Sequence, residues 1–312
     1  MRIVLTDSVD LQQLFREYEV NDYKFVSADI GYDGNVYCLF SACVPSRING
    51  MFVNTSANTE YAALVITPSW YMGNVLHCEK LNFGKHAMNY HFLKPVPDGS
   101  FLLLGSRCMY SEKKGPERNA VFVDREGTVL RSLTFGDGIA DCIVRNDGMI
   151  ITSFFDEGVF GNYGWKNPIG SCGICARNIN GEIIWKPNRD IYDCYAIVID
   201  TKNNIWYYYY DEFDLIKTDF KTETVYHPDR EGSSFLMLAD NNRALIMDGG
   251  YDDPSLCLCR FQKDGLSAWE TIEFLYRDEI VEARIMDAYG SCALIQTNHG
   301  VFFVDFDTLL LS

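Results

Sequence analysis

The sequence predicts an all-β fold, a six-bladed β-propeller whose blades are four-stranded antiparallel sheets, with a short N-terminal helix outside the repeats. The clearest copy of the repeat, Ile139–Trp185, contains four short β-rich runs joined by turns at Asn146–Gly148 and Asn178–Gly181. The same alternation recurs six times along the 312 residues, with a period of about 50 residues, which is typical of propellers. A single twisted sheet of four strands cannot bury both faces, so radial stacking of the repeats is the expected solution.

Two series of turns set the blade boundaries, and the first series carries Asp-Gly, Asn-Asn or a near equivalent. Its members are Asp33-Gly34, Asp98-Gly99, Asp147-Gly148, Asn203-Asn204, Asn241-Asn242 and Tyr289-Gly290. The predicted blades are 24–83, 88–135, 139–187, 191–227, 232–276 and 280–312, within one domain that covers 1–312. The alternative fold, two β-sandwich domains, would need a linker near the middle of the chain, and no Pro/Ser-rich segment or charge run stands there.

The first 23 residues fit the repeat least well. Arg2–Leu5 predicts a strand, and Asp10–Glu19 predicts a helix with Asp10 as its N-cap and Phe15 on its apolar face. The last blade has two candidates for its outer strand. Thr308–Leu311 could be the fourth strand of this blade, or Arg2–Leu5 could replace or extend that strand.

Composition excludes several classes of partner. The net charge of −16 argues against nucleic acid, because phosphate contacts need a concentrated basic face. No run reaches the 18 or more apolar residues of a spanning helix, which excludes a membrane partner on this criterion. Eleven cysteines, several inside predicted strands, and an N-terminus without a cleavage-site pattern indicate a reducing cytoplasm.

A family resemblance is carried by Gly136–Asp141, Asp147-Gly148 and Phe155–Gly161. The chain resembles six-bladed propellers of the NHL and gluconolactonase (senescence-marker-protein) class, and these segments are similar to an uncharacterised bacterial branch of it. The resemblance covers nearly the whole chain in its repeat pattern. It implies the fold and, from the gluconolactonases, a divalent metal at one end of the channel that polarises a carbonyl or activates water. One scaffold of this kind hosts many functions, so the resemblance does not choose among them.

The first strand of each predicted blade starts with a polar residue between apolar neighbours. This set, expected at the mouth of the central channel, is Asp29, His91, Asp141, Asp193, Ser234 and Arg284. If the side chains converge, Asp29, His91, Asp141 and Asp193 form a candidate site for Ca²⁺, Mg²⁺ or Mn²⁺, which prefer oxygen ligands. The alternative is that these groups bind channel water and each other.

Long connections between second and third strands are predicted in four blades, on the face of the channel mouth. They are Val44–Thr59, Ser106–Asn119, Asp156–Cys172 and Asp248–Ser255. Long loops on a rigid scaffold often carry function. The candidate binding residues on them combine acids with aromatic anchors: Asp156, Glu157, Phe160, Tyr163, Trp165 and Tyr251. The alternative is that the loop beginning at Asp156 packs over its own blade and binds nothing.

The cysteines of Cys172-Gly-Ile-Cys175 have the spacing of a metal or redox pair. No second pair of ligands follows them, and they precede a strand rather than a helix, so a structural role is the preferred interpretation. Cys257 and Cys259 share one strand face and are expected in the core.

Two function classes remain. The first is a non-catalytic propeller that binds a partner protein or small ligand on its loop-rich channel face. The second is a divalent-metal-dependent, lactonase-like hydrolase with its site at the channel mouth. The chain contains no G-x-S-x-G, Walker or dinucleotide-binding motif, so the sequence leaves open whether it is an enzyme and which partner or substrate it binds.

Overall fold

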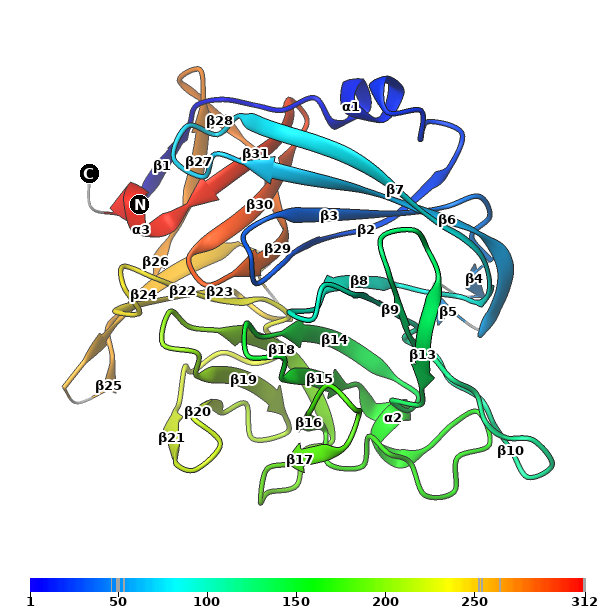
Figure 1. The fold of residues 1–312 in the computed structure, drawn as a ribbon. Coiled ribbons are helices and arrows are strands. Elements are labelled where there is room, and N and C mark those ends of the chain that lie inside the picture. Colours follow the sequence, from blue (N-terminus) through cyan, green and yellow to red (C-terminus); the bar gives the residue numbers. More distant parts are fainter. Residues whose placement is uncertain are drawn as a thin grey trace. The chain divides into compact units, whose positions relative to one another are not determined.

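A computed structural model describes residues 1–45, 47–48, 51–52, 54–251, 253, 255–263 and 265–310. The chain folds into consecutive antiparallel sheets, most of them four-stranded (Figure 1), which confirms the predicted fold class. Within these residues, no helix is long and apolar enough to cross a membrane. The chain divides into two compact units: unit 1 comprises Met1–Leu11, Pro68–Leu76 and Cys194–Ser312, and unit 2 comprises Gln12–Thr67 and His77–Asp193.

Three sheets follow one another in unit 2, coloured blue to green in Figure 1. The first consists of β2 (Lys24–Ile30), β3 (Val36–Ser41), β6 (Ser56–Pro68) and β7 (Val75–Met88). The second consists of β8 (Phe92–Pro95), β9 (Phe101–Leu104), β12 (Ala120–Val123) and β13 (Val129–Leu133). The third consists of β14 (Ile139–Val144), β15 (Ile150–Phe154), β16 (Ile174–Arg177) and β17 (Ile183–Trp185). Smaller elements of this region are α1 (Leu11–Glu17), α2 (Asp156–Phe160), the hairpin β4 (Arg47–Ile48) and β5 (Met51–Phe52), and the hairpin β10 (Tyr110–Ser111) and β11 (Gly115–Pro116).

The predicted Asp-Gly turns connect the first and second strands of these three sheets. In each turn the aspartate accepts a hydrogen bond from the backbone N–H two residues later, at 3.2 Å for Asp33, 3.0 Å for Asp98 and 3.1 Å for Asp147. Such side-chain bonds favour a tight reversal over continued strand. The turn chemistry therefore fixes where each sheet reverses.

Burial on both faces of the middle sheet explains why the sheets stack. Leu103 of β9 packs with residues of the first sheet, among them Leu39, whereas its neighbours Leu102 and Leu104 pack with residues of the third, among them Cys142. All five are fully buried. Alternate side chains of one strand point to opposite faces, so this middle sheet supplies half of two cores, as a blade does.

Unit 1 continues the series of sheets. One consists of β18 (Asp193–Ile199), β19 (Ile205–Tyr210), β20 (Leu215–Thr218) and β21 (Glu223–Tyr226). The next consists of β22 (Leu236–Ala239), β23 (Ala244–Asp248), β24 (Leu256–Gln262), β25 (Gly265–Leu266) and β26 (Glu270–Thr271). The last consists of β29 (Ala283–Tyr289), β30 (Cys292–Thr297) and β31 (Gly300–Asp305), followed by α3 (Phe306–Leu310).

The ends of the chain correct two predictions. Thr308–Leu310 belongs to helix α3 rather than to an outer strand, and position 311 lies outside the described residues. The strand at Arg2–Leu5 does form, as β1, but it pairs in parallel with β27 (Glu273–Tyr276), which also pairs with β28 (Glu279–Val281). This separate sheet takes its strands β27 and β28 from the boundary between the predicted fifth and sixth blades. Helix α1 confirms the predicted N-terminal helix, and its Phe15 is buried.

The described residues thus contain six consecutive blade-like sheets in the predicted order. That these sheets close into one ring, as a single domain over 1–312, stays a prediction.

Candidate functional site

A buried lysine lies among the first strands of the three sheets of unit 2. Strand β8 contacts both β2 and β14, and Lys94 on β8 is only 4% exposed. Its Nζ lies 2.7 Å from Oδ1 of Asp29 on β2, which is 6% exposed. Ser27 donates a hydrogen bond of 3.0 Å to the other oxygen of this carboxylate. The ion pair is therefore shielded from water. In such a poorly hydrated interior, its two charges interact more strongly than they would in water.

Asp141 on β14 is the second carboxylate of this cluster. Its Oδ1 accepts the Cys142 N–H at 2.6 Å, next to an irregularity in the pairing of β14 with β15. Burial raises the pKa of Asp141, the charge of Lys94 opposes that effect, and the charge of Asp29 adds to it. Two carboxylates thus share the field of one ammonium group, which we call the Lys94 cluster (Asp29, Lys94 and Asp141).

Two other predicted channel-mouth residues lie at the bases of the long loops. His91, just before β8, accepts the Ser106 N–H on its Nδ1 at 3.0 Å, and the Ser106 hydroxyl donates to the Ile139 carbonyl at 2.5 Å. Asp193 opens β18, and its pKa is raised to about 6, first by burial and then by the charge of Asp156. Within unit 2, the starts of the first strands and the long loops are therefore joined by direct contacts.

The remaining two residues of the predicted set lie in unit 1. Ser234 precedes β22 and donates its hydroxyl to Asp248 at 2.8 Å. Arg284 lies on β29 and is exposed. The structure thus brings Asp29 and Asp141 together, and whether all six side chains share one channel mouth stays a prediction.

The residues of unit 2 fit a divalent metal poorly. In the described part of the chain, no group of three His, Cys, Asp or Glu side chains could hold a metal ion. Lys94 supplies positive charge to Asp29 and Asp141, the role that the cation would have. Sequence reasoning missed Lys94, although a lysine in the otherwise apolar run Phe92–Pro95 was a usable signal, because lysine is rarely buried without a partner.

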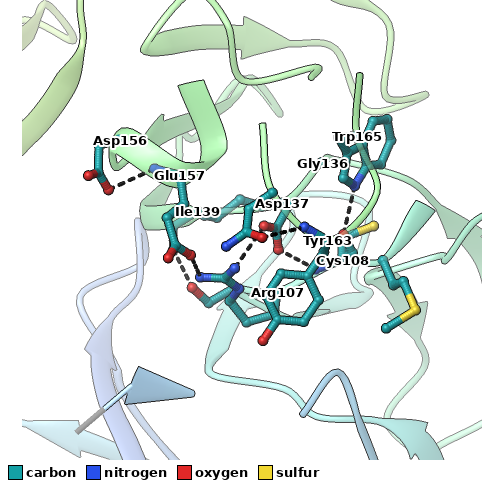
Figure 2. A network of polar contacts seen from close by, with 12 residues as sticks. Arg107, Cys108, Gly136, Asp137, Ile139, Asp156, Glu157, Tyr163 and Trp165 are labelled. Atoms are coloured by element: carbon teal, nitrogen blue, oxygen red, sulfur yellow. Dashed lines mark hydrogen bonds and ion pairs between the residues drawn. The ribbon is translucent and has the colours of Figure 1, made fainter. Parts of the chain in front are cut away.

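A second polar network joins loops 105–119 and 155–173, which contain the predicted long connections Ser106–Asn119 and Asp156–Cys172 (Figure 2). Arg107 is 4% exposed and Asp137 is 2% exposed. The Arg107 guanidinium bonds Asp137 Oδ2 at 3.0 Å through Nη2 and Glu157 Oε2 at 2.5 Å through Nη1. The other Asp137 oxygen accepts the Cys108 N–H at 2.7 Å. An arginine that bridges two carboxylates in this way fixes their positions as well as balancing their charge.

The two carboxylates of this network respond differently to their surroundings. Burial raises the pKa of Asp137 to about 6, although Arg107 and two backbone N–H groups oppose the shift. Burial would also raise the pKa of Glu157, but the hydrogen bonds from Arg107 and Asn162 outweigh it, and the pKa is lowered. At neutral pH both groups are therefore charged and held by one guanidinium group.

Aromatic side chains tie the same two loops together. The Arg107 guanidinium lies 4.3 Å from the ring centroid of Tyr163, and the Trp165 indole N–H donates to the Cys108 carbonyl at 2.7 Å. The Tyr110 N–H bonds the Tyr163 carbonyl at 2.9 Å. A Cβ at Gly164, which has a φ of +87°, would lie 2.3 Å from the Tyr110 carbonyl oxygen, so this crossing requires glycine. These contacts hold the two loops together as a single rigid segment.

Aromatic rings and acids remain exposed on this assembly. Phe160, at the end of α2, is 67% exposed and stacks on Tyr192, with ring centroids 5.7 Å apart. Exposed Asp156 at the start of α2 and the nearby Asp193 provide negative charge. We call Asp156, Phe160, Tyr192 and Asp193 the α2 surface.

The predicted binding residues of the loops therefore have different places. Glu157, Tyr163 and Trp165 hold the loops together, whereas Asp156 and Phe160 are exposed. Tyr251 is 62% exposed but belongs to unit 1, where its hydroxyl lies 2.5 Å from that of Tyr195. The segment expected as a plain loop contains a helical turn, α2, whose Gly161 N–H bonds the Glu157 carbonyl at 3.0 Å.

Sequence reasoning missed Arg107 and Tyr192, and it used Asp137 only as part of a family-like motif. Arg107 and Asp137 are separated by 30 positions, and nothing local to either residue indicates the other. Tyr192 directly precedes the predicted channel-mouth residue Asp193, so an aromatic residue beside an acid was a signal that could have found it.

No protein-family model matches this chain, and no curated protein matches it. Among solved structures, a chain of the mitotic checkpoint complex is similar at 10% identity and a TM-score of 0.49, over 90% of this chain and 87% of that one. The WD40 β-propeller domain of Doa1 is similar at 8% identity and a TM-score of 0.45, over 90% and 92%. A gluconolactonase from Xanthomonas campestris is similar at 8% identity and a TM-score of 0.38, over 68% and 81%. At this level of similarity, no role of any residue is transferred from these proteins.

Proposed function

We propose that this chain is a non-catalytic propeller that binds a partner protein through the α2 surface of its loop-rich face. The observation that carries the proposal is that loops 105–119 and 155–173 are locked together by Arg107, Asp137 and Glu157 before any partner is bound. A surface that is already ordered loses little conformational entropy on binding. Ordered loops that present exposed aromatic side chains are typical of recognition surfaces.

The chemistry of the α2 surface indicates the kind of partner. The stacked rings of Phe160 and Tyr192 offer an apolar contact that also attracts cations. Asp156 and Asp193 stand beside them, and the whole chain carries a net charge of −16. We therefore propose a basic protein segment, with lysine or arginine next to an apolar side chain, as the partner. The cysteines of the described residues are free thiols, which is typical of proteins in a reducing compartment. We therefore propose that the protein meets its partner in the cytoplasm.

Site-specific photo-crosslinking in cells of the source organism tests this function. A photoreactive phenylalanine analogue is placed at position 160, at position 192, and at position 130 as a control. Leu130 lies on the outer strand β13 of the same unit and is 53% exposed. We expect positions 160 and 192 to give adducts with one common protein, attached through a Lys- or Arg-rich segment. No common adduct, an acidic attachment segment, or the same adduct from position 130 would contradict the proposal.

Affinity measurements with the identified partner then show how much Phe160 contributes to binding. Phe160→Ser is expected to weaken binding by roughly 30-fold, the effect of removing a binding hot spot. Leu130→Ser is expected to change it by less than about threefold, because most exposed positions outside a hot spot contribute little. Both variants keep the buried Arg107 network intact, so their stabilities serve as the control.

The alternative, a divalent-metal-dependent lactonase-like hydrolase using Asp29, His91, Asp141 and Asp193, stays a prediction. The positive charge that Lys94 already supplies to Asp29 and Asp141 gives it less support than the binding function. Calorimetric titration of metal-stripped protein with Ca²⁺, Mg²⁺ and Mn²⁺ distinguishes the two, since only the hydrolase requires heat of binding that Asp141→Ala removes.

A further inference from the structure

A small pocket of unit 1 lies beside β31, the last strand of a three-stranded sheet (Figure 1). Its wall also includes the end of β1 with the residues after it, and the turn between β6 and β7; all of these segments belong to unit 1. We call it the Asp7 pocket (Asp7, Trp70, Tyr71 and Phe303). Its volume is about 50 Å³. Since a space of about 10–15 Å³ holds one water, the pocket takes a group of roughly four heavy atoms.

The backbone at Phe303 faces the outer edge of this sheet. Val301 exchanges two hydrogen bonds with Val9 across the edge, at 2.7 and 3.0 Å. The Phe306 N–H instead bonds the Ser291 carbonyl on the inner side, at 2.9 Å. Because these directions alternate along an antiparallel strand, Phe303 faces outward, as Val301 does. Its N–H and C=O have no backbone partner among the described residues, although Phe303 is only 3% exposed. The pocket wall therefore includes a carbonyl oxygen that can accept a hydrogen bond from a ligand.

Asp7 supplies negative charge to the pocket. Among the described residues that line it, the acids are Asp7 and Asp305, and none is basic. Asp305 already caps helix α3, because its Oδ1 accepts the Asp307 N–H and its Oδ2 accepts the Thr308 hydroxyl, both at 3.0 Å. Asp7 is exposed, and no described residue forms an ion pair with it. Asp7 is thus the carboxylate that is left for a ligand.

The turn between β6 and β7 packs directly against Asp7. Ser69 closes this turn: its N–H bonds the Asn74 carbonyl at 2.8 Å, and its carbonyl accepts the Gly73 N–H at 2.7 Å. Gly73 has a φ of +73°, and a Cβ there would lie 3.3 Å from the Asp7 carbonyl oxygen. Glycine therefore allows the turn to approach the segment that carries the acid.

Two aromatic residues of the same turn complete the wall. The ring of Trp70 meets that of Phe303 edge to face, with centroids 5.8 Å apart and an interplanar angle of 82°. Tyr71 is 82% exposed, so its ring is available to a ligand at the rim. Aromatic faces attract cations, tryptophan most strongly. Aromatic rings beside a carboxylate without an ion-pair partner are therefore favourable surroundings for a positive charge.

We propose that the Asp7 pocket binds the end of a primary alkylammonium group, carried by a lysine side chain of another protein or by a free amine. An ammonium group has three N–H donors. The Asp7 carboxylate and the Phe303 carbonyl accept two of them, and water accepts the third. The ammonium nitrogen with its last two or three carbons matches the size of the pocket. The site shares no residue with the α2 surface, so it does not depend on the function proposed above.

Fluorine NMR of the full-length protein labelled with 5-fluorotryptophan tests the site. The chain contains five tryptophans, and Trp70→Phe identifies the signal of Trp70. At constant ionic strength, n-butylammonium should shift this signal saturably, with a Kd of roughly 1–10 mM, and should leave the other tryptophan signals in place. The neutral analogue n-butanol should bind roughly tenfold more weakly, because it lacks the charge that the acid and the rings attract.

Matched variants test the acid. Asp7→Asn should weaken n-butylammonium binding roughly fivefold, whereas Asp229→Asn, the same change at another exposed acid of unit 1, should leave it unchanged. Tighter binding of Nα-acetyl-lysine methylamide than of n-butylammonium would identify a protein side chain as the ligand, and the reverse order would identify a free amine. An absent or unsaturable Trp70 shift up to about 100 mM, equal affinity for n-butanol, or unchanged affinity in Asp7→Asn would overturn the proposal.

Discussion

Replacing Arg107 by alanine is expected to lower the free energy of unfolding by about 3–5 kcal/mol, the usual effect of removing one partner of a buried ion pair. Arg107 is 4% exposed and holds Asp137 and Glu157 at once. Without it, the Asp137 carboxylate stays buried with no opposite charge. Urea unfolding monitored by circular dichroism measures the change.

Two further variants separate charge from packing. Adding Asp137→Asn to Arg107→Ala removes the uncompensated charge and should restore part of the lost stability. Arg125→Ala is the matched control, because Arg125 pairs with Glu79 at an exposed site, and such pairs contribute about 0–1 kcal/mol. Equal losses in Arg107→Ala and Arg125→Ala would show that the Arg107 network does not hold the loops.

Replacing Lys94 by methionine is expected to have an effect of similar size, about 3–5 kcal/mol at neutral pH. The substitution removes the ammonium group whose charge opposes those of Asp29 and Asp141. The pKa of Asp141, which burial already raises, should then lie further above its unfolded value because the opposing charge of Lys94 is gone, so the native state takes up a proton that the unfolded state does not. The loss is present above the folded pKa and disappears as the pH falls toward the unfolded pKa.

This pH dependence distinguishes a charge effect from a packing defect. The difference in unfolding free energy between Lys94→Met and the unmodified protein should shrink between neutral pH and about pH 4. Lys217→Met is the control, since Lys217 is 31% exposed and lies 3.8 Å from Asp200. A loss at Lys94→Met that is the same at all pH values would mean that the ammonium group does not balance the two acids.

The sequence predicts much of this fold because its signals are local. An aspartate at a turn accepts a hydrogen bond from the backbone two residues later, as Asp98 and Asp147 do, so a short window contains the whole cause. The positions of the first strands, and with them Asp29 and Asp141, follow from the spacing of such turns. The long loops follow in the same way, as interruptions between second and third strands.

The remaining features depend on partners far apart in the sequence. The parallel pairing of Arg2 with Glu273, and the ion pair of Arg107 with Asp137, join segments whose local patterns do not refer to each other. Helix α3 replaces the predicted last strand, and its Phe306 is fully buried in the core that includes β1 and β31. Tertiary packing there overrides the β-propensity of the final residues.

Amide hydrogen exchange of the free protein is the most direct test of the central claim, that the loops beneath the α2 surface are ordered before a partner binds. The decisive amides are those of Cys108, bonded to Asp137 at 2.7 Å, and Tyr110, bonded to the Tyr163 carbonyl at 2.9 Å. We predict protection comparable to that of the core strands β9 and β15, lost at both amides in Arg107→Ala. Exchange of both amides at the rate of an unstructured peptide in the unmodified protein would contradict the account.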